Sequence, residues 1–116
     1  MFKNQAILAL AVLGSAALAQ AEKPVGCFPS VKGFVDLGPS TFQSVGLCND
    51  QCQAAGFPVF GLTNGTDCAC GQVADIPAAD TKVDDGLCDT PCPGYEENTN
   101  HIVLGGGNGV VSVYTN

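Results

Sequence analysis

The most extended apolar run of the chain lies close to its beginning. Residues Ala6 to Leu18 are mostly Ala, Leu, Ile and Val, and Lys3 precedes them. A short basic head followed by an apolar stretch is typical of a secretory signal peptide, and small residues at Ala17 and Ala19 predict cleavage after Ala19, with Ala21 as a second candidate. A retained membrane anchor is the alternative, but spanning a bilayer takes roughly 20 apolar residues. We therefore expect residues 1–19 to be removed.

A helix is predicted from Val45 to Ala55. Ser44 is suited to cap its first turn, and Gly56 stands where a residue with positive φ would end it. Cys48 and Cys52 are four residues apart, which places them on one face of a helix. Both cysteines are expected to point into the interior.

A hairpin is predicted after this helix. Phe57 to Thr63 is rich in aromatic and branched residues and runs into Asn64 and Gly65, which favour a turn. Residues 68–71 are expected to return as the partner strand.

The last third of the chain predicts little regular structure before its end. Residues 72–94 contain three prolines and many Asp and Gly, and indicate one helical turn near Asp84 to Cys88. Val110 to Tyr114 alternates Val with Ser and predicts a closing strand, with Val25 to Phe28 beside it.

Charge restricts the class of partner. Without the leader fewer than 100 residues remain, enough for one domain over residues 25–116. Three lysines and no arginine then face eleven carboxylates, a net charge of −8. Nucleic acids and anionic membranes reward clustered cations, so neither is an expected partner. A neutral polysaccharide carries no such penalty.

Seven cysteines follow the predicted leader, and in a secreted chain they indicate a disulfide framework. The cysteines form a Gly-Cys-Phe opening at 26–28, then C-x3-C, C-x-C and a second C-x3-C: Cys27, Cys48, Cys52, Cys68, Cys70, Cys88 and Cys92. Further short motifs accompany them, Cys-Gly at 70–71, Cys-Pro-Gly at 92–94 and Ser-Val-Tyr at 112–114. This ordered series closely resembles the WSC domain over nearly the whole mature chain.

The resemblance implies an α+β fold: a small disulfide-rich domain with one main helix packed on a short antiparallel sheet. It also implies binding of cell-wall glucans and related polymers, as in fungal extracellular proteins. WSC domains have an eighth cysteine before the final strand, where this chain has Gly105, so one thiol is left over. Spacing does not tell which one. A monomer is expected, and a disulfide-linked dimer is the alternative that an odd cysteine leaves open.

Sugar recognition needs flat aromatic faces and planar polar groups. The candidate binding residues are exposed rings and a polar turn: Asn64, Thr66, Asp67, Tyr95 and Tyr114. Packing of Tyr114 on the core is the alternative for that ring, and Phe28, Phe34, Phe42, Phe57 and Phe60 are expected in the core. Asn64-Gly65-Thr66 is also an N-glycosylation sequon, so a glycan on Asn64 would compete with a sugar contact there.

Catalytic chemistry is not indicated. His101 is the only histidine, which excludes a triad or a histidine-rich metal site, and seven secreted cysteines favour disulfides over zinc. The acidic pairs Asp84-Asp85 and Glu96-Glu97 are neighbours in sequence and seldom face each other across a scissile bond. No catalytic residue, metal or cofactor is therefore assigned.

The sequence thus predicts a secreted, free-standing domain of the extracellular space or cell wall. Its expected ligand is a neutral wall polysaccharide, first β-glucan and next chitin or xylan. The alternative is a secreted effector or wall-structural protein that uses the same scaffold to bind other proteins without binding sugar.

Overall fold

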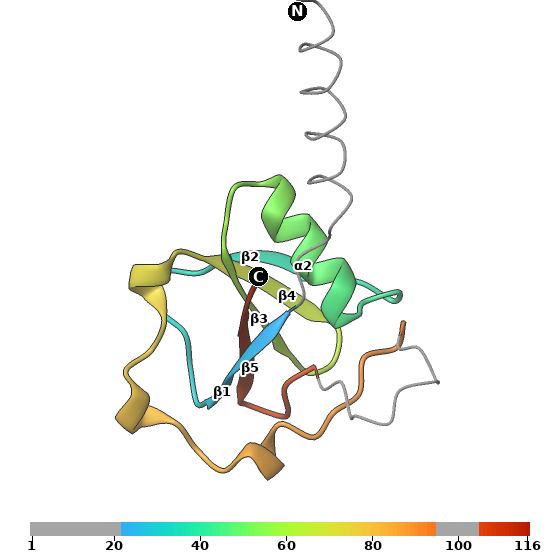
Figure 1. The fold of residues 1–116 in the computed structure, drawn as a ribbon. Coiled ribbons are helices and arrows are strands. Elements are labelled where there is room, and N and C mark those ends of the chain that lie inside the picture. Colours follow the sequence, from blue (N-terminus) through green and yellow to red (C-terminus); the bar gives the residue numbers. More distant parts are fainter. Residues whose placement is uncertain (1–21, 95–104) are drawn as a thin grey trace, which may run out of the picture.

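The computed structural model describes residues 22–94 and 105–116, so the predicted leader and Tyr95 lie outside it. Five antiparallel strands form one sheet in the order β1-β5-β3-β4-β2 (Figure 1). The elements are β1 Lys23–Phe28, β2 Val35–Pro39, α2 Val45–Ala54, β3 Val59–Thr63, β4 Asp67–Gly71, the 3-10 turns η1 Val73–Asp75, η2 Ala79–Thr81 and η3 Asp85–Leu87, and β5 Val111–Thr115. The predicted α+β class, with one helix on a short antiparallel sheet, is confirmed.

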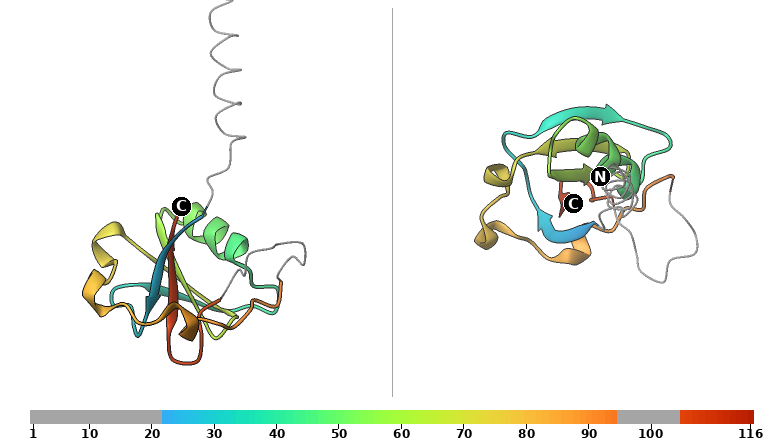
Figure 2. Two further views of the ribbon diagram at one scale, coloured as in Figure 1. Left: turned by 60° about the horizontal axis from the view of Figure 1, so that its bottom comes forward. Right: turned by 45° about the horizontal axis from the view of Figure 1, so that its top comes forward.

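Helix α2 begins and ends as its sequence predicts. The Ser44 hydroxyl accepts a hydrogen bond from Leu47 N at 2.9 Å, which satisfies one of the free amides of the first turn. Gly56 has a φ of +89° just beyond the last turn, a conformation that glycine adopts without steric cost. The helix covers β3 and β4 on one face of the sheet (Figure 2).

Two neighbouring disulfides join α2 to β4. Cys48 bonds to Cys68 and Cys52 to Cys70. Four helical residues advance about 6 Å and two strand residues about 6.6 Å, so a C-x3-C helix face matches a C-x-C strand face. The sulfurs of Cys52 and Cys68, from different bridges, are 3.8 Å apart. The spacing of the cysteines thus aligns the helix along the strand.

The sheet has a hydrophobic cluster on each face. Beneath α2 lie the two bridges with Phe60 and Leu62, and on the other face, here called the outer face, Phe28, Val59 and Val113 pack with partly buried side chains that include Phe34. Alternate residues of β3 therefore serve opposite faces, as a period of two requires.

Residues 72–94 follow the periphery of the domain as three short 3-10 turns (Figure 1). The predicted helical turn near Asp84 to Cys88 is confirmed as η3, and the other two turns were not predicted. The disulfide between Cys27 and Cys88 ties this segment to β1, and Val83 N donates to Cys27 O at 2.9 Å.

Strand β2 was missed by the sequence prediction. Its apolar-polar alternation is limited to Val35, Asp36 and Leu37 before Gly38 and Pro39, and it is an edge strand with a register irregularity between Asp36 and Gly38. Strand β3 begins at Val59, two residues later than predicted, because Phe57 N still bonds to Cys52 O at the helix end.

Candidate functional site

The predicted polar turn joins β3 to β4. Asn64 and Gly65 have φ values of +57° and +78°, conformations that Asn and Gly tolerate best. Gly65 N donates to Gly105 O at 2.9 Å, and Asn64 N donates to Gly107 O at 3.3 Å. The structure therefore brings the turn against a segment far along the chain.

Thr66 and Asp67 lie together at the end of this turn. The Thr66 hydroxyl donates to Asp67 Oδ1 at 2.9 Å. Thr66 O accepts hydrogen bonds from Ser40 N at 3.1 Å and from the buried Gln43 side chain at 3.2 Å. Three of the five predicted binding residues, Asn64, Thr66 and Asp67, are thus held together by hydrogen bonds at the β3–β4 turn, which we call the corner of the sheet.

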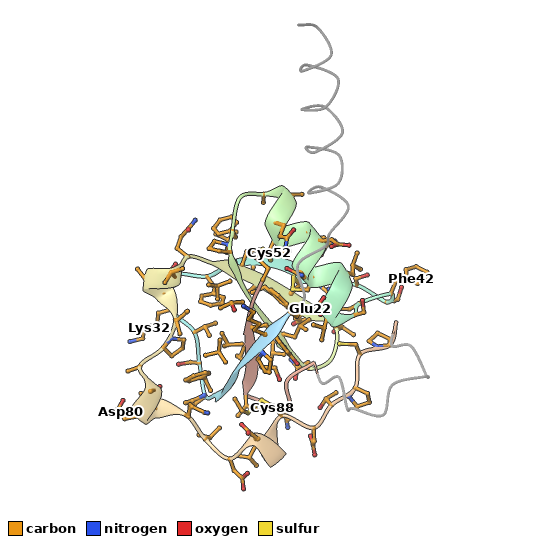
Figure 3. All side chains as sticks on the ribbon, in the orientation of Figure 1. Glu22, Lys32, Phe42, Cys52, Asp80 and Cys88 are labelled. Atoms are coloured by element: carbon orange, nitrogen blue, oxygen red, sulfur yellow. A yellow bond between two sulfur atoms is a disulfide. The ribbon has the colours of Figure 1, made fainter. Side chains whose placement is uncertain are left out.

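The loop that supports this corner carries an exposed aromatic ring. Phe42 is 78% exposed and projects from the body of the domain (Figure 3). The prediction that it lies in the core is wrong, since Gln43 turns inward in its place and Gly94 packs on the backbone of Phe42 with no room for a side chain. The loop presents the ring to solvent.

A groove of about 210 Å³ crosses the outer face of the sheet at the same corner. Its floor is formed by Gly61 and Ala69, which pair across β3 and β4 and have little or no side chain. We call it the outer-face groove, and its lining residues are Val31, Phe34, Asp36, Gly61, Thr63, Asp67, Cys68, Ala69 and Val111.

Phe34 forms the aromatic wall of the outer-face groove. A methyl group on Gly71 would lie 2.6 Å from the Phe34 ring, and one on Gly61 would lie 3.5 Å from it. The absence of a side chain at Gly71 therefore allows the ring to pack directly on the sheet, whereas a methyl group on Gly61 would make an ordinary contact with the ring and would instead crowd Val111 at 2.9 Å. Glycines inside strands indicate close approach of other groups, and this was the signal available in the sequence.

Two carboxylates from different strands border the groove. Asp36 Oδ1 accepts from Gly38 N at 2.9 Å, and Asp67 Oδ1 accepts from the Thr66 hydroxyl. An aromatic ring covers the C–H face of a pyranose, and carboxylates accept hydrogen bonds from its hydroxyls. The groove thus combines both kinds of contact, from Phe34 and Asp36, which sequence reasoning did not assign to a site, and from Asp67, which it did.

Tyr114 lies elsewhere. It is on β5 opposite Phe60, with ring centroids 5.2 Å apart and an angle of 11° between planes, on the helix side of the sheet. The alternative of packing on the core therefore describes Tyr114. The residue also lines a cleft of about 390 Å³ together with Pro24, Lys82 and the Cys27–Cys88 bridge.

Cys92 is the unpaired cysteine of the framework. It is 3% exposed, and burial raises its pKa from 9.0 to about 11. A methyl group built on Gly105 would lie 2.7 Å from Cys92 Sγ. The position where the family has its eighth cysteine therefore faces the thiol that lacks a partner.

A cluster of three sulfurs, from Cys48, Cys52 and Cys68, has the closeness of a metal site. All three belong to disulfides, so they present no thiolate for a metal ion. The cluster is structural.

The sequence profile of the WSC domain matches residues 25–100, which is more than half of the chain. The chain belongs to the WSC-domain family. The resemblance drawn from its cysteine pattern is confirmed.

Curated relatives of this WSC domain come from yeasts. Protein SLG1 of Saccharomyces cerevisiae is 32% identical over 115 residues, which cover 98% of this chain and 28% of that protein. Cell wall integrity and stress response component 3 of the same organism is 35% identical over 75 residues, 65% of this chain and 12% of that protein. The chain thus spans less than a third of the length of either relative.

In the ranges 22–94 and 105–116, no helix combines the length and the apolar character that crossing a bilayer demands.

Proposed function

We propose that this WSC domain is secreted and binds a neutral cell-wall polysaccharide, β-glucan first and chitin or xylan next, with the outer-face groove as its site. The observation that carries the proposal is the Phe34 ring, packed on Gly71, which lines one groove with the Asp36 and Asp67 carboxylates. The printed name of one relative, a cell wall integrity and stress response component, supports a role at the cell wall.

Phe42 extends the proposed surface. It lies on the loop whose residues Ser40 and Gln43 hydrogen-bond to Thr66 O, next to Asp67 in sequence. A protein that binds a long polymer contacts more than one of its sugar units, and an exposed aromatic ring can pack against a second unit. Tyr95, which follows Gly94 in sequence, is proposed as a further contact.

Binding rather than catalysis is the proposed activity. Within the described residues, the carboxylates that border the groove come from β2 and β4, and the groove lining includes no histidine or serine. We propose that the leader, residues 1–19, directs the domain out of the cell and that it acts there as a monomer, since burial of Cys92 removes the thiol that would link two chains.

The test is a pull-down of residues 22–116, expressed through a secretory pathway, on insoluble β-glucan, chitin, xylan and cellulose. We expect retention on at least one of the first three polymers and weaker retention of Phe42→Ala and of Asp67→Asn. Val73→Ala is the matched control, because Val73 is 64% exposed but lies on η1, outside the groove lining.

The second candidate is a protein-interaction module, favoured by the exposure of the apolar Phe42 ring to solvent. Absence of retention on every polymer by a correctly folded domain would support it and reject sugar binding. Release of reducing ends from a polymer would instead indicate a hydrolase.

Glycosylation of Asn64 is a separate proposal. Asn64 is exposed at the tip of the β3–β4 turn within an Asn-Gly-Thr sequon. Secretory expression should add the mass of an N-glycan that Asn64→Gln lacks. Stronger polymer retention of Asn64→Gln would show that the glycan shields the corner, whereas equal retention would place the ligand deeper in the groove.

A further inference from the structure

We infer that the outer-face groove prefers a β-linked chain that carries amino sugars, such as partly deacetylated chitin, over the same chain in its neutral form; this rests on the proposed function. The charge of the lining carries the inference. Asp36 and Asp67 are its only charged residues, and both are acidic.

The two carboxylates lie on the same face of neighbouring strands. Asp36 on β2 is opposite Ala69 on β4, and Asp67 is two residues before Ala69, so the two are diagonal neighbours. Among the described residues, Asp36 Oδ1 accepts from Gly38 N and Asp67 Oδ1 accepts from the Thr66 hydroxyl, and neither Oδ2 accepts a hydrogen bond. Since both residues line the groove, we infer that these Oδ2 atoms can contact a ligand there.

The lysines of the described chain lie at other places. Lys82 lies over Gly26 on the opposite edge of the sheet, and Lys23 is at the start of β1. Lys32 follows Val31 in sequence but lines a separate hollow with Asp75, and its side chain points away from the domain (Figure 3). A ligand in the groove therefore meets negative charge without a compensating protein cation.

An ammonium group on a sugar ring complements this lining. The ring would pack on Phe34, Val31 and Val111, while the amine approaches the carboxylates. A protein-bound calcium ion takes roughly six to eight oxygen ligands, which two carboxylates beside an apolar wall do not supply. The combination of an apolar wall with paired carboxylates favours an organic cation.

The experiment compares two soluble probes that differ only in acetylation, the hexamer of glucosamine and the hexamer of N-acetylglucosamine, by calorimetry at mildly acidic pH. We expect the glucosamine hexamer to bind about threefold to tenfold more tightly at low ionic strength, because each exposed ion pair contributes modestly. The preference should vanish near 1 M salt, where the Debye length is about 3 Å.

The double variant Asp36→Asn/Asp67→Asn should abolish this preference, because it removes both negative charges. Each amide keeps the Oδ1 acceptor that its neighbour uses, so the local hydrogen bonds are preserved. Asp50→Asn/Asp80→Asn is the control: it changes the net charge equally, but Asp50 lies on α2 and Asp80 on η2. Unchanged thermal unfolding would verify that both variants fold.

Equal or tighter binding of the acetylated hexamer, or a preference that survives Asp36→Asn/Asp67→Asn, would overturn the inference and leave the proposed function standing. A preference lost equally in the control variant would reduce it to a general charge effect and would overturn it as well. No binding of either hexamer, nor of a β-glucan hexamer, would overturn the proposed function together with the inference.

Discussion

Cys92 and Gly105 face each other across a gap that one side chain would fill. A Cβ atom on Gly105 would lie 2.7 Å from Cys92 Sγ, near the separation of about 3 Å that a disulfide sets between these atoms. Gly105 N also donates to Thr90 O at 2.7 Å, which ties the two segments together by backbone. The scaffold therefore keeps the arrangement of a fourth bridge without its covalent bond.

Gly105→Cys should form that fourth bridge. Closing a loop of this length stabilises a domain by about 3 kcal/mol, part of which the close approach to Gly65 Cα at 2.8 Å would offset. We expect no free thiol in the denatured variant, a peptide map that joins residues 92 and 105, and a higher Tm than that of Gly105→Ala. A free thiol in folded Gly105→Cys would contradict the arrangement.

The Cys92 thiol should be inert in the folded protein. Because it is 3% exposed, we expect no reaction with a thiol reagent under native conditions and one reactive thiol per chain in denaturant. Rapid reaction of the native protein, or a reducible dimer on non-reducing electrophoresis, would show that Cys92 is accessible after all.

Stability should fall at alkaline pH. The Cys92 pKa is 9.0 when the thiol is exposed to water and about 11 in the folded state, so above pH 9 the unfolded chain loses the proton first. Stability contributed by the neutral thiol is thus complete below pH 9 and declines by up to about 2–3 kcal/mol as the pH approaches 11. Rapid urea unfolding across this range measures the slope, and Cys92→Ala should lack this component.

Ser44→Ala should destabilise the domain by about 1 kcal/mol, because Leu47 N would lose its capping acceptor. In a domain of this size, that loss lowers the Tm by roughly 4–8 °C. Ser30→Ala, at an exposed position outside the helices and strands, is the control. Equal melting temperatures of the two variants would mean that the cap contributes nothing.

Truncation of Phe60 should reduce the stability of the domain strongly, and truncation of Phe42 should hardly change it. Phe60 is fully buried and stacked on Tyr114, so Phe60→Ala should cost about 3–5 kcal/mol. Phe42→Ala should change the free energy of unfolding by less than about 0.5 kcal/mol, since its ring is in solvent. Chemical denaturation of both measures this, and a large loss for Phe42→Ala would assign that ring a structural role.

Gly71→Ala should displace the wall of the outer-face groove. The new methyl group would lie 2.6 Å from the Phe34 ring, and overpacking of this kind costs about 1–3 kcal/mol. Polymer retention should weaken together with stability. Gly86→Ala is a matched control, because its methyl group would make only an ordinary contact with the Asp84 side chain at 3.6 Å. Full retention by folded Gly71→Ala would place the ligand away from Phe34.

Local signals made much of the fold predictable. The Ser44 cap, Gly56 and the Asn64-Gly65 turn act within a few residues through hydrogen bonds and φ preferences, so the helix and the hairpin could be placed from the sequence. Strand β2 could not be placed, because its alternation extends over only three residues before Gly38 and Pro39, and its pairing to β4 at the edge of the sheet is a long-range contact.

Burial and pairing required the folded chain. The sequence itself determined the WSC framework, the single unpaired thiol and the acidic balance, since these depend only on residue type and order. Only the tertiary structure decided that the thiol is Cys92, that Phe42 faces solvent and that Phe34, Asp36 and Asp67 border one groove. These outcomes depend on contacts between segments far apart in sequence, and such contacts are set by the packing of the whole domain rather than by any local pattern.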